Sequence, residues 1–352
     1  MVRTRRSDCS RPGIARRRRG KGFSYYWEDT GEKVVDSEVL QRISDLVLPP
    51  AWRDVWVCPI PNGHLQAVGT DAAGRKQYRY HDDWRRRRDA AKFDEMLEFA
   101  RVLPDLRDAV AAHLATEGVG RDRVLACAVR LLDRVFFRIG TEVGQSGDTE
   151  TFGLTTIRKE HAAVDHERIT FTYDAKGGKR RIHALVDPEA RDVIAALKRR
   201  RAGSDQLLAF REGRRWVDVT ARDVNEWIKQ QTGGDYSAKD FRTWNATVLA
   251  AVALAVSGPA AASRAARKRA AARAAKEVGD YLGNTPAVAR TSYIDPRVFD
   301  RYDSGWTISG ADIGNAEPGE LSIHSEIEDA VLDLLARDTS SAAVEKVTAL
   351  AS

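Results

Sequence analysis

Five side chains in this sequence could together transfer a phosphoryl group without a metal ion: Arg138, Lys176, Arg242, Asn284 and Tyr293. A phenol can attack phosphorus as a nucleophile, while guanidinium groups and an amide can donate hydrogen bonds to oxygens on which negative charge develops. An ammonium group can protonate the leaving oxygen. These are the parts needed to cut a phosphodiester bond through a phosphotyrosine.

Taken singly, each of these residues has an ordinary explanation. A tyrosine at the end of a helix usually packs, and a lysine in a hairpin turn is usually solvated. An arginine beside an apolar segment usually pairs with a carboxylate of its own chain. The functional interpretation therefore rests on the whole set and on the distinctive local sequence around each member.

The segment from Asn284 to Tyr293 is predicted to hold a short helix. Gly283 and the pair Thr285-Pro286 interrupt the preceding helical pattern, and proline is suited to the first turn of a new helix. Such a helix would carry the phenol of Tyr293 about two turns away from the amide of Asn284.

Arg138 is expected at the end of a helix over residues 121–137, where the chain enters a polar, glycine-rich loop. Two strands, over residues 168–173 and 181–186, are expected to form a hairpin whose turn carries Lys176. From the tip of a hairpin, a flexible ammonium group can reach into a duplex.

Arg242 is expected in the first turns of a buried helix. Ser237 is a good N-cap residue, and the apolar run 248–256 continues the same helix. An arginine placed against so apolar a segment needs a partner, and an oxyanion would serve as one. The following segment, residues 260–277, has basic residues on nearly all sides, and we expect it to pack little and to lie along DNA.

The hydrophobic pattern predicts an α+β fold with two lobes. Residues 22–88 alternate short strands with turns around one helix that begins near Ser37, which indicates a small β-rich amino-terminal lobe. Residues 89–308 are expected to form a larger, mainly α-helical catalytic lobe. Its first part predicts two separate helices, the first beginning near residue 85 and the second over about residues 106–114.

Charge is unevenly distributed along the chain, whose lysines and arginines outnumber its acidic residues by 57 − 51 = 6. Residues 1–21 are strongly basic and are expected to form a disordered arm. Residues 309–352 are expected to form an acidic tail with one amphipathic helix that docks onto this protein or onto a partner. The basic arm and mildly basic body favour nucleic acid over an anionic membrane surface as the partner.

Several motifs are absent from the sequence. It has no phosphate-binding loop of the G-x-x-x-x-G-K-[ST] type and no pair of aspartates two residues apart, so neither a nucleotide cofactor nor a metal ion is expected. The longest apolar run is too short to cross a bilayer, which takes roughly 20 residues. The three cysteines are scattered, which fits a reducing cytoplasm.

A basic and aromatic strand is expected over residues 75–81. Cations and aromatic rings alternate along it, which makes it a plausible contact for a DNA groove or phosphate. An exposed, charged edge strand is the alternative explanation. The residues expected to contact DNA are Arg75, Lys76, Gln77, Tyr78 and Tyr80, together with Lys159 from a motif described next.

At these positions the sequence resembles the type IB DNA topoisomerases, in particular the compact bacterial and poxvirus-like enzymes. The resemblance covers about residues 22–300, and its motifs are strong only when they are taken together. They are Phe137-Arg138-Ile-Gly, Phe152 to His161, Lys176-Gly-Gly-Lys179, Lys239 to Thr243, Gly283 to Tyr293, Pro49 to Trp52 and Gly74 to His81.

The resemblance implies an ATP-independent and metal-independent enzyme that relaxes supercoiled duplex DNA as a monomeric clamp in the nucleoid. It assigns Tyr293 as the nucleophile that forms a 3′-phosphotyrosyl bond, Arg138 and Arg242 as the two catalytic arginines, and Lys176 as the hairpin lysine. Asn284 stands where many relatives have histidine. An amide can donate a hydrogen bond to a phosphoryl oxygen but cannot shuttle protons near neutral pH.

Two other functions remain open on the sequence. A tyrosine site-specific recombinase uses a similar set of residues, but typically has a histidine three residues before the second arginine, where this sequence has Lys239. A non-catalytic, basic DNA-binding protein with the same fold is the other alternative.

Overall fold

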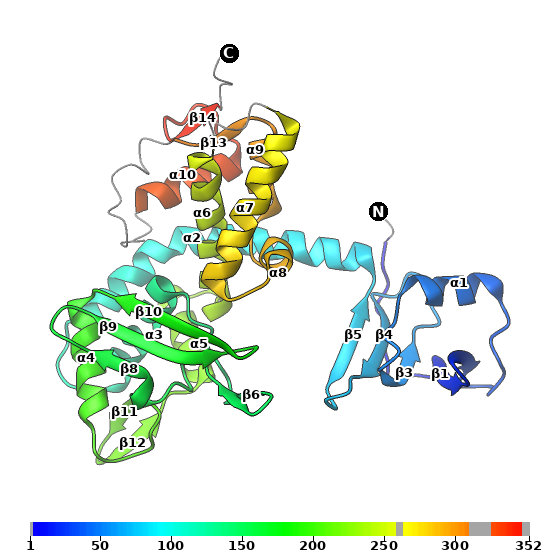
Figure 1. The fold of residues 1–352 in the computed structure, drawn as a ribbon, viewed down its shortest axis with the longest axis horizontal. Helices are drawn as coiled ribbons and strands as arrows, with labels where there is room; N and C mark the ends of the chain where they lie inside the picture. Colours follow the sequence, from blue (N-terminus) through cyan, green and yellow to red (C-terminus); the bar gives the residue numbers. More distant parts are fainter. Residues whose placement is uncertain (1–2, 258–262, 310–324, 347–352) are drawn as a thin grey trace. The chain divides into compact units, whose positions relative to one another are not determined.

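The computed structural model describes residues 3–257, 263–309 and 325–346. By its internal contacts the chain forms two compact units, Met1–Lys92 and Phe93–Ser352 (Figure 1). The division falls inside helix α2 (Asp82–Leu114), whereas the sequence interpretation placed the boundary after residue 88. Among the described residues, no helix combines the length and apolarity that crossing a membrane would require.

The first unit is built on an antiparallel five-stranded sheet in the order β2-β1-β3-β4-β5. Helix α1 (Ser37–Asp45) begins at an Asp36 N-cap and buries Ile43 against the sheet. The strands are β1 (Ile14–Arg19), β2 (Gly22–Trp27), β3 (Arg53–Val57), β4 (Leu65–Thr70) and β5 (Lys76–Tyr80).

The prediction that residues 1–21 form a disordered arm is wrong. Ile14, the first residue of β1, is fully buried in the core of the sheet. Strand β1 pairs with β2 along its whole length. The guanidinium groups of Arg16 and Arg17 lie over the rings of Phe23 and Tyr26, at 4.2 and 4.5 Å from the ring centroids. Cation–π contacts of this kind let a run of arginines form a strand despite its charge.

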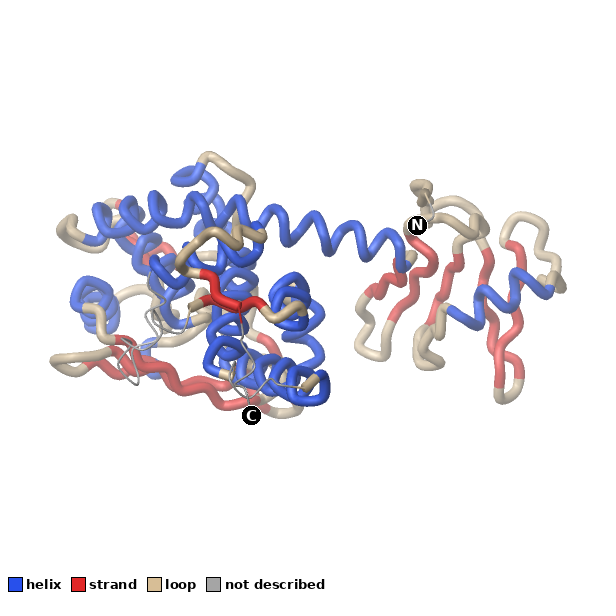
Figure 2. The backbone as a smooth tube through the Cα atoms, turned by 90° about the horizontal axis from the view of Figure 1, so that it is seen from above, coloured by secondary structure: helices blue, strands red, loops and turns tan. Residues whose placement is uncertain are grey.

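The second unit is mainly helical, and Figure 2 shows that helices predominate there whereas strands predominate in the first unit. The predicted α+β fold class is confirmed. Besides α2, the helices are α3 (Arg121–Val135), α4 (Pro188–Arg199), α5 (Ala221–Thr232), α6 (Ala238–Val256), α7 (Arg264–Leu282), α8 (Pro286–Ser292), α9 (Pro296–Asp303) and α10 (Ser325–Ala336).

The strands of the second unit are short. The longest pair, β9 (Ile169–Ala175) and β10 (Lys179–Leu185), forms the predicted hairpin, to which β8 (Ala162–Val164) adds a third strand. Two further hairpins were not predicted: β6 (Gly144–Ser146) with β7 (Thr149–Thr151), and β11 (Ala209–Glu212) with β12 (Arg215–Asp218). The antiparallel pairing of β13 (Trp306–Ile308) with β14 (Val344–Lys346), on the far side of α10 in the chain, was not predicted either.

Helix α2 is continuous, so the prediction of two separate helices over this part of the chain is wrong. Pro104 lies inside it, although proline removes a backbone donor and usually interrupts a helix. The buried side chains Phe99, Leu103 and Leu106 continue at helical spacing across the proline. Burial of this apolar stripe favours one long helix over two short ones.

Helix α7 also departs from its prediction. We expected the basic segment 260–277 to pack little, but Ala270, Ala274 and Val278 are buried on one face of the helix. Alanine is small enough for this face to lie close against its neighbours while the basic side chains project elsewhere. Residues 260–262 of the predicted segment lie outside the described residues.

The carboxy-terminal helix α10 is part of the core of the second unit. Its residues Ile327, Val331 and Leu334 are buried there. The buried carboxylate of Glu328 accepts hydrogen bonds from Arg107 of α2 and from the indole of Trp244. The predicted amphipathic helix is therefore present and docks onto this protein itself. Residues 310–324 and 347–352 lie outside the described residues.

Candidate active site

Arg138 follows α3 in a segment whose backbone is fixed on both sides. Phe136 ends the helix in the left-handed conformation, with φ of 58°. The Arg138 carbonyl then accepts a hydrogen bond from the amide of Leu154, at 2.8 Å. Gly140 and Gly153 touch at this crossing, where a Cβ on Gly153 would come within 2.6 Å of the Gly140 Cα. The two glycines let the segments approach closely enough to hold the arginine in place.

Arg242 lies in the first turns of α6, which starts with a capping box formed by Ser237 and Asp240. The arginine is only 5% exposed. Its Nη1 donates to the carbonyl of Phe136 at 2.7 Å and its Nη2 to the carbonyl of Leu282 at 3.0 Å, while its Nε has no hydrogen-bond partner in the described part of the chain. Burial, and then the positive charge of Arg138, lower the pKa of Arg242 to about 10.

Asn284 and Tyr293 flank α8, as the sequence predicts, with Thr285 as the N-cap of the helix and Tyr293 at its end. Asn284 is 8% exposed, and its Oδ1 accepts a hydrogen bond from Arg138. The side-chain nitrogen Nδ2 of Asn284 is buried and makes no hydrogen bond to the described residues. The ring of Tyr293 lies 5.2 Å from the guanidinium carbon of Arg242. Arg138, Arg242, Asn284 and Tyr293 are thus brought together.

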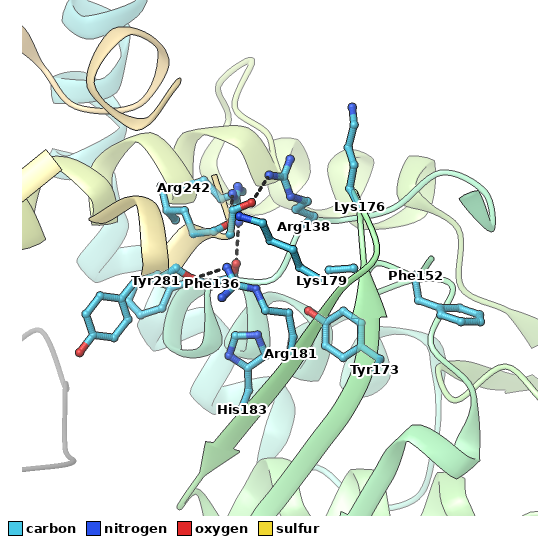
Figure 3. Close-up of a pocket in the computed structure, with 13 residues that line it drawn as sticks. Phe136, Arg138, Phe152, Tyr173, Lys176, Lys179, Arg181, His183, Arg242 and Tyr281 are labelled. Atoms are coloured by element: carbon cyan, nitrogen blue, oxygen red, sulfur yellow. Dashed lines mark hydrogen bonds between the residues drawn. The ribbon is translucent and has the colours of Figure 1, made fainter. Parts of the chain in front are cut away.

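Lys176 occupies the tip of the β9–β10 hairpin, and it lines a small pocket that also contains Arg138 and Arg242. Figure 3 shows its side chain pointing away from the guanidinium groups. The turn is built on Gly177 and Gly178, whose φ angles are +86° and +68°. The structure therefore places Lys176 beside the site without bringing its ammonium group into the cluster.

The pocket also contains three side chains of β10 that were not among the predicted site residues. Lys179, Arg181 and His183 occupy alternate positions of β10 and line the pocket (Figure 3). Burial, and then the charges of Arg181 and Arg242, lower the pKa of His183 to about 4. The period-two spacing of these basic residues could have shown that they share one face of the strand, but not that the face meets the site.

Two other tyrosines, Tyr173 and Tyr281, line the same pocket, whereas Tyr293 is not among its lining residues. Tyr173 is buried, and burial raises the pKa of its phenol. Figure 3 shows the Tyr281 hydroxyl pointing away from the guanidinium groups. This phenol is also 46% exposed. Contact with the arginines therefore favours Tyr293 as the nucleophile, even though Tyr281 is nearer the pocket wall.

The residues expected to contact DNA lie on β5 of the first unit and on a short 3₁₀ turn of the second. Arg75 and Gln77 both donate to the carboxylate of Asp71, which fixes the turn before β5. Tyr78 is 48% exposed, and its ring lies 6.3 Å from that of Tyr80 on the same face of the strand. Lys76 is exposed on that strand, and Lys159 donates to the carbonyl of Arg200 at 3.3 Å.

Comparison with known proteins covers most of the chain. The family model described as "Eukaryotic DNA topoisomerase I, catalytic core" matches residues 81–308, and the model "Bacterial DNA topoisomerase IB, N-terminal domain" matches residues 22–71. The DNA topoisomerase 1B of Acanthamoeba polyphaga mimivirus is 29% identical over 289 residues, which cover 80% of this chain and 85% of the viral protein. The first model alone spans more than half of the chain.

Proposed function

The chain belongs to the type IB DNA topoisomerase family, of the compact bacterial and viral kind, and on this premise we propose which of its residues carry the reaction. Tyr293 attacks the scissile phosphorus of duplex DNA and expels the 5′ oxygen, which leaves a 3′-phosphotyrosyl bond. The observation that supports this assignment is the contact of the Tyr293 ring with Arg242, which lines the same pocket as Arg138 and Arg181.

Arg138, Arg242 and Asn284 stabilise the charge that develops on the non-bridging oxygens. The Nε of Arg242 and the side-chain Nδ2 of Asn284 are buried donors without partners among the described residues. A phosphoryl oxygen between them would satisfy both donors, and each preorganised donor contributes roughly 10²–10³ in rate. Asn284 acts as a neutral donor and has no acid–base duty, since an amide does not titrate near neutral pH.

Lys176 acts as the general acid for the leaving 5′ oxygen. Because the lysine is exposed, its ammonium group must swing inward when DNA binds. The two glycines of the hairpin turn permit such a change, and a Cβ on Gly177 would meet no other atom. Protonating a leaving group this basic contributes roughly 10²–10⁴ in rate.

Religation needs no ATP, because one phosphodiester bond is exchanged for another of similar energy. We propose that Arg75, Lys76, Gln77, Tyr78, Tyr80 and Lys159 contact the duplex outside the cleavage site. The protein would act as a monomer on DNA of the nucleoid in the cytoplasm, and no nucleotide cofactor or metal ion takes part in these steps.

A plasmid relaxation assay tests this mechanism. The plasmid carries no recombination sites, the buffer contains a metal chelator, and the wild-type protein is compared with Tyr293→Phe. We expect relaxation by the wild type and none by the variant, with DNA binding unchanged in a mobility-shift assay. Relaxation by Tyr293→Phe would remove Tyr293 from its role, and a requirement for paired sites would indicate a recombinase.

A further inference from the structure

Four consecutive backbone carbonyls at the end of α7 accept hydrogen bonds from three arginines. The carbonyls of Asp280 and Tyr281 accept from Nη1 and Nη2 of Arg181, at 2.7 and 3.2 Å. The carbonyl of Leu282 accepts from Arg242 at 3.0 Å, and that of Gly283 accepts from Arg138 at 3.3 Å. The last carbonyls of a helix have no partner within the helix, so these guanidinium groups supply the missing donors.

The three arginines come from separate parts of the chain. Arg138 follows α3, Arg181 is on β10 and Arg242 is on α6, and Figure 3 shows their guanidinium groups converging. None of the three forms a salt bridge with a carboxylate of the described residues. The negative end of the α7 dipole therefore provides the local compensation for three positive charges.

Arg181 differs from the other two arginines in where it acts. Its hydrogen bonds join the strand that follows the Lys176 turn to the residues just before Asn284. Its guanidinium also packs against the backbone of Gly283, where a Cβ would lie 2.2 Å from Nη2. The residue thus ties the hairpin to the end of α7 and fixes the point from which Asn284 and α8 leave that helix.

We propose that Arg181 is a positioning residue for the cleavage reaction, which holds the end of α7 so that the Asn284 amide meets the scissile phosphate. This inference rests on the proposed function. Arg181 itself need not touch DNA, because both its Nη atoms are already used by backbone carbonyls. Displacement of a catalytic group by about 1 Å can slow a reaction by 10²-fold.

Single-turnover cleavage tests this role. The substrate is a duplex with a nick close to the cleavage site, so that the short 5′ product diffuses away and the covalent adduct accumulates on a denaturing gel. Rates are measured at saturating protein for the wild type, Arg181→Ala, Arg181→Lys and the control Arg180→Ala. Arg180 is the neighbouring exposed arginine on the opposite face of β10, so its removal deletes the same charge from the same strand.

We expect Arg181→Ala to slow cleavage by about 10- to 100-fold, with DNA affinity unchanged. Arg181→Lys, which keeps one donor, should fall between Arg181→Ala and the wild type and also covers the case in which the alanine variant does not fold. Arg180→Ala should cleave within about twofold of the wild type. In an Asn284→Ala background, Arg181→Ala should have almost no further effect, because a residue that acts through Asn284 has nothing left to position.

Two results would overturn the inference. One is full additivity, in which Arg181→Ala slows cleavage by the same factor with and without the Asn284 side chain. The other is an unchanged rate at saturating protein combined with weaker DNA binding and a salt dependence reduced by about one phosphate contact, which would make Arg181 a direct DNA ligand. If the wild type formed no adduct at all, the proposed function would have failed, which is a separate outcome.

Discussion

Replacing Gly283 by alanine should damage both stability and cleavage, and a matched substitution elsewhere separates the two causes. Gly283 ends α7 with φ of +68°, and Gly233 ends α5 with the same φ of +68°. A Cβ at Gly283 would lie 2.2 Å from Arg181 Nη2, whereas nothing lies within 4 Å of a Cβ at Gly233. The two variants therefore share the cost of the left-handed backbone and differ only in the clash.

The left-handed conformation costs alanine about 1–2 kcal/mol, which is all that Gly233→Ala should lose. In Gly283→Ala the Arg181 guanidinium must also leave two carbonyl acceptors. Hydrogen bonds to a charged group contribute about 1.5–3 kcal/mol each when nothing replaces them. Since Arg181 is partly exposed, water replaces some of this, and we expect Gly283→Ala to lose about 1–3 kcal/mol more than Gly233→Ala.

Urea denaturation measures both losses, and single-turnover cleavage measures the functional effect. We expect Gly283→Ala to cleave at least tenfold more slowly than Gly233→Ala, because its Arg181 no longer holds the end of α7. Equal stabilities and equal cleavage rates for the two variants would refute the reasoning, since the clash would then have been absorbed without disturbing the site.

Two further perturbations probe the second unit. Glu328→Ala should lower the free energy of unfolding by about 2–4 kcal/mol, because Arg107 keeps only the carboxylate of Asp133 and the indole of Trp244 loses its acceptor. In urea denaturation the exposed control Glu326→Ala should change the free energy of unfolding by less than about 0.5 kcal/mol. A similar loss in both variants would show that α10 is not part of the core. The pKa of His183 is lowered to about 4 in the folded protein, whereas the same side chain in the unfolded chain binds a proton near pH 6.5. Above pH 6.5 this histidine should therefore not affect the free energy of unfolding. Between pH 6.5 and 4 the unfolded chain binds the additional proton, and the free energy of unfolding should fall by up to about 3 kcal/mol. When the free energy of unfolding is measured against pH, His183→Gln should lack this fall between pH 6.5 and 4. The same fall in that variant would contradict the lowered pKa of His183 as its cause.

The sequence predicted the elements that carry the catalytic candidates because each has strong local signals. Ser237 caps α6, Thr285-Pro286 starts α8 and the glycines after Lys176 make the hairpin turn. Such signals act within a few residues and do not depend on the rest of the fold. Local chemistry of this kind is what sequence patterns report best.

The errors arise where the outcome depends on side-chain contacts that no local capping or turn signal reports. In β1 the guanidinium groups of Arg16 and Arg17 lie over the rings of Phe23 and Tyr26 on the adjacent strand β2. Helix α2 stays continuous across Pro104 because its apolar stripe is buried. Arg181 was not predicted as a site residue because its acceptors are backbone carbonyls of α7. Every residue has a carbonyl, so the sequence does not show which carbonyls will accept from a distant side chain.

The identity of the attacking tyrosine is the central claim, and the covalent adduct itself tests it most directly. Protein trapped on DNA is digested with a protease and a nuclease, and the peptide that retains a nucleotide is sequenced by mass spectrometry. We predict a nucleotide on Tyr293, normal adduct formation by the control Tyr281→Phe, and no adduct with Tyr293→Phe. A nucleotide on Tyr281, or an adduct that persists in Tyr293→Phe, would contradict the account.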